Sequence, residues 1–197
     1  MKQRLLRGTY RGRVIDSLSQ KVTRSMTMRG RKTLLDLLFH SAVGRSHASC
    51  WHECVVLDGF CGSGALGIES LSMGCLSVSF IDLDSVALMT TRNNIASLRL
   101  DSRARCLCHD MTSLPRRWRA YPSHHVFFLT PPWHGDMAYD ALCCLDTGRW
   151  LHRHALGMVE TARQEDDVSV PSAYHVVRRH ACGDHVFTFM RYCGIES

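Results

Sequence analysis

Short apolar runs alternate with helical patterns along most of this chain. The stretch 65–73 has a helical pattern, and Asp84 is placed to cap a second helix that ends near Leu98. Four runs bounded by turns or helices have the features of strands: 54–57, 78–81, 103–108 and 126–129. Strands that alternate with helices predict a parallel sheet covered on both faces, in an open, doubly wound α/β fold.

The two ends of the chain add further elements to this pattern. Near the N-terminus, Ser25 or Thr27 is placed to cap a helix that runs through the apolar residues of 34–39. Downstream, three more strands are predicted, at 157–160, 174–179 and 185–191. The last two are joined at Gly183 and Asp184, so we expect an antiparallel hairpin to close the sheet.

Composition indicates a folded, water-soluble protein. The 197 residues are 45% hydrophobic, 21% charged and 8% aromatic, which excludes disordered, collagen-like and coiled-coil classes. The length suggests one domain with an appendage. There is no apolar run long enough to span a membrane, and the opening residues 1–4 lack the apolar stretch of a signal peptide. We therefore expect a soluble, cytoplasmic protein.

Positive charge is concentrated in the first part of the chain. Residues 1–32 hold ten Lys and Arg against one acid, a net +9, whereas residues 33–197 hold fourteen against seventeen, a net −3. Arginine supplies 21 of the 24 basic residues, and its planar guanidinium suits phosphate contacts and base stacking. This pattern predicts a nucleic-acid contact, and the alternative is a solvated or disordered tail.

Ten cysteines in a chain with no export signal favour reduced thiols over a disulfide framework. Two clusters of cysteine and histidine, at 47–54 and 106–109, each contain residues that could supply half of a zinc site. No second Cys-x-x-Cys pair follows at zinc-finger spacing, so we expect small buried side chains and no metal.

The strongest motif is a glycine-rich turn between the first predicted strand and the helix after it. Gly62, Gly64 and Gly67 form G-x-G-x-x-G in the strand–turn–helix setting that a nucleotide-like cofactor requires. Asp82 follows twenty residues after Gly62, where a carboxylate accepts hydrogen bonds from ribose hydroxyls, and Asp110 is placed to accept from an adenine amino group. Each acid alone has an alternative role as a cap or turn residue, but three successive strand ends favour an adenosine cofactor.

The charge of the loop indicates which adenosine cofactor it binds. Asp58 lies at its expected mouth, and residues 55–68 contain no Lys or Arg. A carboxylate attracts the sulfonium and ammonium groups of S-adenosylmethionine and repels the pyrophosphate of a dinucleotide. The loop therefore favours S-adenosylmethionine over NAD.

The segment Thr130-Pro131-Pro132-Trp133 follows the fourth predicted strand. Two successive prolines fix an extended backbone with no free N–H, so that its carbonyls are expected to face the crevice. Trp133 offers a flat apolar surface beside them. The segment therefore predicts a platform for a flat base, and the alternative is a stiffened loop.

These motifs together resemble the RsmD family of 16S ribosomal RNA guanine-N2 methyltransferases over nearly the whole chain. Residues 4–13 are similar to the family's basic, aromatic-containing opening, and 24–38 to its first helix. Residues 58–67 are similar to the family's cofactor loop and 80–84 to its ribose segment, while 159–160 and the hairpin also fit.

The resemblance implies a Rossmann-like, seven-stranded class I S-adenosylmethionine-dependent methyltransferase fold with an antiparallel C-terminal hairpin. It implies a basic RNA-binding arm or hairpin over 1–24 and a methyltransferase domain over 25–197. S-adenosylmethionine would donate a methyl group to guanine 966 of 16S RNA, leaving S-adenosylhomocysteine. The substrate would be the small ribosomal subunit or its assembly intermediate, and the enzyme a cytoplasmic monomer with no membrane partner.

The resemblance also assigns roles to individual residues. Those implied to bind the cofactor are Thr27, Asp58, Phe60, Gly62, Gly64, Gly67, Asp82 and Asp110. Those implied in catalysis are Thr130, Pro131, Pro132 and Trp133. Those implied to bind RNA are Arg7, Arg11, Arg13 and Arg24.

One position departs from the family pattern. Thr130 stands where the family has Asp or Asn, and Ser25 replaces a proline. The usual carbonyl oxygen accepts a hydrogen from the amine and helps localise its lone pair, whereas a threonine hydroxyl is shorter and uncharged. Because of Thr130, a catalytically weakened, RNA-binding assembly factor is an alternative to the active enzyme. A methyltransferase for DNA adenine or protein glutamine is a further alternative, and an NAD-linked oxidoreductase is the least favoured.

Overall fold

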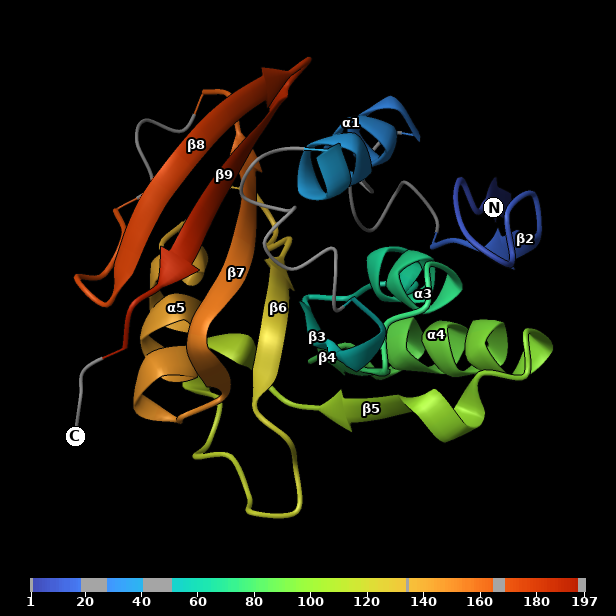
Figure 1. Cartoon of the computed structure of the whole chain (residues 1–197), viewed down its shortest axis with the longest axis horizontal. Helices are drawn as coiled ribbons and strands as arrows, with labels where there is room; N and C mark the ends of the chain where they lie inside the picture. The colour runs from blue at the N-terminus through green and yellow to red at the C-terminus, as the bar shows by residue number, and fades with distance from the viewer. Residues whose placement is uncertain (1, 19–27, 41–50, 134, 165–168, 195–197) are drawn as a thin grey trace.

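The computed structural model describes residues 2–18, 28–40, 51–133, 135–164 and 169–194. Its centre is a seven-stranded sheet in the order β5-β4-β3-β6-β7-β9-β8 (Figure 1). The five strands from β5 to β7 are parallel, and β9 and β8 are antiparallel to their neighbours. The strands are β3 (Val55–Gly59), β4 (Ser77–Asp82), β5 (Ala104–Cys108), β6 (His124–Leu129), β7 (Leu151–Ala162), β8 (Tyr174–Cys182) and β9 (His185–Tyr192). The predicted α/β sheet with a closing hairpin is therefore confirmed.

The helices divide between the two faces of this sheet. Residues that alternate along the strands separate into two core clusters, with Val56 and Phe128 in one and Leu57 and Phe127 in the other. The first cluster packs beneath α1 (Met28–His40), α3 (Ala65–Ser72) and α4 (Ser85–Ser97), and the second beneath α5 (Met137–Thr147). Three short 3-10 helices complete the order: η1 (Trp51–Glu53), η2 (Asp101–Arg103) and η3 (Met111–Ser113).

Helix α5 is absent from the sequence predictions. Its buried positions are Ala138, Ala141, Leu142 and Leu145, which have the i, i+3, i+4, i+7 spacing of an amphipathic helix. Two of the four are alanines, and two cysteines follow Leu142, so the apolar stripe is weak in the sequence. Packing against the second face of the sheet makes this segment a stable helix.

The first described residues form a small hairpin that packs on the main domain. Strands β1 (Lys2–Arg4) and β2 (Val14–Asp16) pair antiparallel. Leu5 and Ile15 are each only 1% exposed and belong to the same core cluster as α3 and α4. Residues 2–18 are therefore a docked hairpin and not a solvated tail.

The described cysteines are all free thiols, nine in number. Cys54, Cys61 and Cys75 are buried, as predicted, but Cys108 and Cys193 are exposed, so the expectation of burial is wrong for these two. Among the described residues there is no cluster of three His, Cys, Asp or Glu side chains placed to hold a metal. Within the same ranges, no helix has the length and apolar character needed to cross a membrane.

Candidate cofactor and base-binding site

The carboxyl ends of the parallel strands meet at one edge of the sheet, where ligands of such folds bind (Figure 1). Strand β3 leads into the glycine-rich turn, and α3 begins at Ala65. The turn is made by left-handed residues: Phe60, Gly62 and Gly64 have φ values of 57°, 55° and 75°. Gly67 is required for packing, because a Cβ there would lie 2.3 Å from the ring of Phe80 on β4.

Two carboxylates accept hydrogen bonds from the turn and from the first turn of α3. The Gly67 N–H donates to Asp58 at 2.9 Å, and the Gly62 N–H donates to Asp82 at 2.8 Å. The hydroxyl of Thr91 on α4 donates to the carbonyl of Gly62 at 2.8 Å. The turn therefore has a fixed shape, set by groups on β3, β4 and α4.

Asp58 lies inside β3 beneath the turn, not at its mouth as the sequence suggested. It is 1% exposed, and burial raises the pKa of its carboxyl to about 7, against the opposing effect of the Gly67 N–H. The charge of Asp82 raises this pKa further. A buried carboxyl of this kind is readily ionised by a cationic ligand placed above the turn.

Asp82 and Asp110 differ in how their oxygens are used. The two oxygens of Asp82 accept from Gly62 N and from Asp84 N, at 2.8 and 2.9 Å, and each keeps a second lone pair for a hydroxyl. Asp110 caps η3: one oxygen accepts from both the N–H and the hydroxyl of Thr112, which lowers the pKa of Asp110. The capping alternative thus accounts for the hydrogen bonds of Asp110, and its role toward adenine stays a prediction.

The segment after β6 is bonded directly to the glycine-rich turn. The N–H of Thr130 donates to the carbonyl of Gly59 at 3.3 Å, and its hydroxyl donates to the carbonyl of Phe60 at 3.2 Å. Because the hydroxyl proton is used in this bond, the lone pairs of the Thr130 oxygen remain available as acceptors. Pro131 is buried and Pro132 exposed.

A buried pair of polar side chains, Glu160 and His185, supports Trp133, and the sequence analysis did not predict this pairing. The indole of Trp133 lies edge-to-face with the imidazole of His185, with centroids 5.1 Å apart. His185 Nδ1 lies 2.5 Å from a carboxylate oxygen of Glu160, and the two residues are 6% and 4% exposed. This short contact fixes the orientation of the imidazole ring beside Trp133. The pairing depends on the register of β7 and β9, which residue types alone do not reveal.

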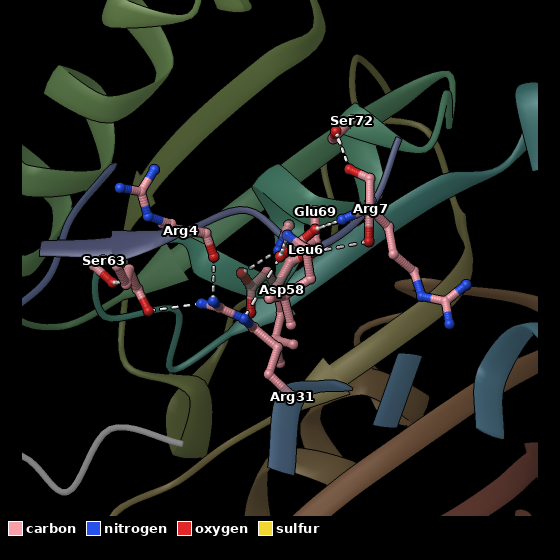
Figure 2. A network of polar contacts seen from close by, with 12 residues as sticks. Arg4, Leu6, Arg7, Arg31, Asp58, Ser63, Glu69 and Ser72 are labelled. Atoms are coloured by element: carbon pink, nitrogen blue, oxygen red, sulfur yellow. Dashed lines mark hydrogen bonds and ion pairs between the residues drawn. The ribbon is translucent and has the colours of Figure 1, made fainter. Parts of the chain in front are cut away.

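The N-terminal hairpin is attached to α3 through a buried network, drawn in Figure 2. Glu69 on α3 is fully buried and accepts from the N–H groups of Leu6 and Arg7, at 2.7 and 3.2 Å. The guanidinium of Arg31 lies 3.5 Å from Glu69 and donates to the carbonyl of Arg4 at 2.6 Å. Burial lowers the pKa of Arg31 and raises that of Glu69, and their mutual attraction opposes both shifts.

The same hairpin also reaches the glycine-rich turn. Gln3 donates to the hydroxyl of Ser63, which lies between Gly62 and Gly64, at 3.0 Å. The side-chain amide of Asn94 donates to the carbonyls of Ser63 and Asp16 at 3.0 and 2.9 Å. The hairpin and the turn are thus parts of one hydrogen-bonded unit.

The arginines predicted to bind RNA lie in different surroundings. Arg11 and Arg13 are exposed on the hairpin, and Arg7 is partly buried beside α3. Arg24 and Thr27 lie outside the described residues.

Comparison with known proteins identifies the family. A family model described as "Conserved hypothetical protein 95" matches residues 3–191. Ribosomal RNA small subunit methyltransferase D of Haemophilus influenzae is 30% identical over 163 residues, covering 82% of this chain and 80% of that protein. The chain belongs to the RsmD family. The protein of the same name from Escherichia coli is 27% identical over 180 residues, covering 91% of this chain and 85% of that protein.

Solved structures share the fold. A putative methylase from H. influenzae superposes with a TM-score of 0.77 at 26% identity, covering 98% of this chain and 99% of the other. A putative methyltransferase from E. coli gives a TM-score of 0.79 at 24% identity, covering 99% and 100%. The predicted class I methyltransferase fold is confirmed, and this RsmD-family chain is a methyltransferase.

Proposed function

We propose that this protein transfers a methyl group from S-adenosylmethionine to the N2 amine of a guanine, guanine 966, in the 16S RNA of the small ribosomal subunit. Its relatives are named as small-subunit ribosomal RNA methyltransferases. We also propose that the protein works in the cytoplasm and as a monomer. The observation that carries it is the direct bonding of the Thr130 segment to the glycine-rich turn at Gly59 and Phe60.

The residues present fit S-adenosylmethionine. Residues 55–68 contain no Lys or Arg, and the absence of positive side chains suits a cationic ligand. Asp82 keeps lone pairs for ribose hydroxyls, and Asp58 supplies a buried carboxyl beneath the turn. When bound, the cofactor supplies an electrophilic methyl group. The product is S-adenosylhomocysteine.

The chain's own residues would act on the base. The guanine amine is a weak nucleophile because its lone pair is delocalised into the ring. The Thr130 oxygen, with its proton donated to Phe60, accepts an amine hydrogen and helps localise that lone pair as the methyl arrives. Trp133, fixed against His185, forms an apolar wall for the base. The carbonyl of Pro131 is the second candidate acceptor.

Mass spectrometry of small-subunit RNA nucleosides tests the reaction. Cells that lack the gene should lose one N2-methylguanosine, and purified protein with S-adenosylmethionine should restore it to the unmethylated subunits. Cofactor and RNA binding without N2-methylguanosine would instead support the weakened RNA-binding assembly factor, the candidate that Thr130 favours. A methylated adenine or glutamine product would show that the methyl acceptor is not a guanine.

Calorimetry tests the cofactor separately. Asp82→Ala should weaken S-adenosylmethionine binding by about 1–3 kcal/mol, the cost of leaving polar groups unpaired. Asp82→Asn keeps an acceptor for the Gly62 N–H and should bind with intermediate affinity. NAD should not compete, and unchanged affinity in Asp82→Ala would remove this residue from the site.

A further inference from the structure

A second concentration of positive charge runs from the start of β5 into the loop that precedes β6. Residues 103–121 hold five arginines and one acid, a net +4. Elsewhere beyond residue 32 the chain holds nine basic residues and sixteen acids, a net −7. A positive segment on an otherwise acidic body is the electrostatic pattern of a nucleic-acid contact.

The connecting loop of this segment, which projects below β6 in Figure 1, is firmly held. The indole N–H of Trp150 donates to the carbonyl of Pro115 at 2.8 Å. Arg117 is turned inward: its Nε donates to the carbonyl of Arg149 at 2.8 Å, and its guanidinium also donates to the carbonyl of Tyr121. Arg117 therefore fixes the shape of the loop, and the loop needs no partner to become ordered.

The outward side of the loop presents an aromatic side chain. Trp118 is 49% exposed, and its ring lies 5.7 Å from that of His109 and 5.5 Å from that of Tyr121. The guanidinium of Arg105 lies 5.1 Å over the Tyr121 ring. The indole is thus held by its neighbours while half of its surface faces solvent, an unusual position for so large an apolar group.

Exposed arginines lie near this indole in the sequence and on the neighbouring strand β5. Arg116 and Arg119 are exposed on either side of Trp118 in the sequence, and Arg105 is exposed on β5. We name Arg105, Arg116, Trp118 and Arg119 the Trp118 patch. The loop that carries the patch leads into the amino end of β6, and Trp118 also contacts His109, the residue that directly follows β5.

We propose that the Trp118 patch is a second RNA contact, in addition to the N-terminal hairpin. Its arginines bind phosphates, and Trp118 stacks on an unpaired base, the combination by which single-stranded nucleic acid is bound. A pre-ordered indole also avoids the entropic cost of fixing a side chain on binding. The inference rests on the proposed function in taking RNA as the partner.

Binding of transcribed 16S RNA at several salt concentrations tests the patch. Arg116→Gln with Arg119→Gln should reduce the slope of log affinity against log salt by about one to two units. Trp118→Ala should weaken binding about tenfold or more with little change in slope, and Trp118→Phe should retain most of the affinity. The charge-matched control is Arg153→Gln with Arg178→Gln, exposed arginines on β7 and β8.

Three readouts separate the possible results. Calorimetry with S-adenosylmethionine and urea unfolding should be unchanged in all patch variants. The inference is overturned if the patch variants bind RNA as tightly as the control does. It is also overturned if they bind RNA normally but no longer bind a ribosomal protein of the small subunit. Methyl transfer by the wild type is scored independently: RNA binding through the patch without methyl transfer refutes the proposed function alone, and a wild type that binds no RNA refutes both.

Discussion

Removing the Thr130 hydroxyl should slow methyl transfer far more than it destabilises the protein. Thr130→Val keeps the shape and deletes the oxygen that bonds Phe60 at 3.2 Å. Loss of one hydrogen-bonding partner in a transition state costs about 10²-fold in rate, which corresponds to about 2.7 kcal/mol. Loss of one neutral hydrogen bond in the folded state should lower the free energy of unfolding by only about 1 kcal/mol.

The assay is single-turnover methyl transfer to unmethylated small subunits at saturating cofactor. Thr130→Ser retains the hydroxyl and should react within a few-fold of the wild type. Thr130→Asn restores a longer acceptor and should equal or exceed the wild type. A Thr130→Val variant as fast as the wild type would refute a chemical role for this oxygen, and an inactive wild type with an active Asn variant would point to the RNA-binding assembly factor.

Three further predictions concern stability, pH and RNA. Glu69→Ala removes the charge partner of the buried Arg31 and the acceptor of two backbone N–H groups. Urea unfolding should therefore show a free energy of unfolding lower by about 3–5 kcal/mol. A decrease under about 1 kcal/mol would contradict this role of Glu69. Burial raises the pKa of Asp58 from 3.8 to about 7, so the folded state holds this proton more tightly. The free energy of unfolding should therefore fall as pH rises across that interval, and Asp58→Asn should remove this part of the slope; an unchanged slope would show that Asp58 does not titrate there. Replacing Arg7, Arg11 and Arg13 by Gln should reduce the salt slope of RNA binding by about two to three units and leave cofactor affinity unchanged, and an unchanged slope would exclude the hairpin from RNA binding.

The sheet could be predicted because its signals are local. A parallel strand buried on both faces needs an apolar run, and its ends need turn or cap residues, so β3, β4 and β6 are confirmed to within two residues. The cap at Asp84 is likewise confirmed by its bond to the N–H of Val86. Helix α5 could not be predicted, because its alanine-rich stripe becomes distinctive only when the second face of the sheet covers it.

The sequence by itself determined which residues gather at the carboxyl edge, because a parallel sheet brings its strand ends together: the glycine turn, Asp82 and Thr130. Only the tertiary structure decided what each charge does there. Arg31 contributes to the positive count of the N-terminus, yet it is buried and bonded to the hairpin. Glu160 becomes a support for Trp133 only through its bond to His185. The reason is physical: a charged side chain acts through its burial and its partner, and residues far away in the chain set both.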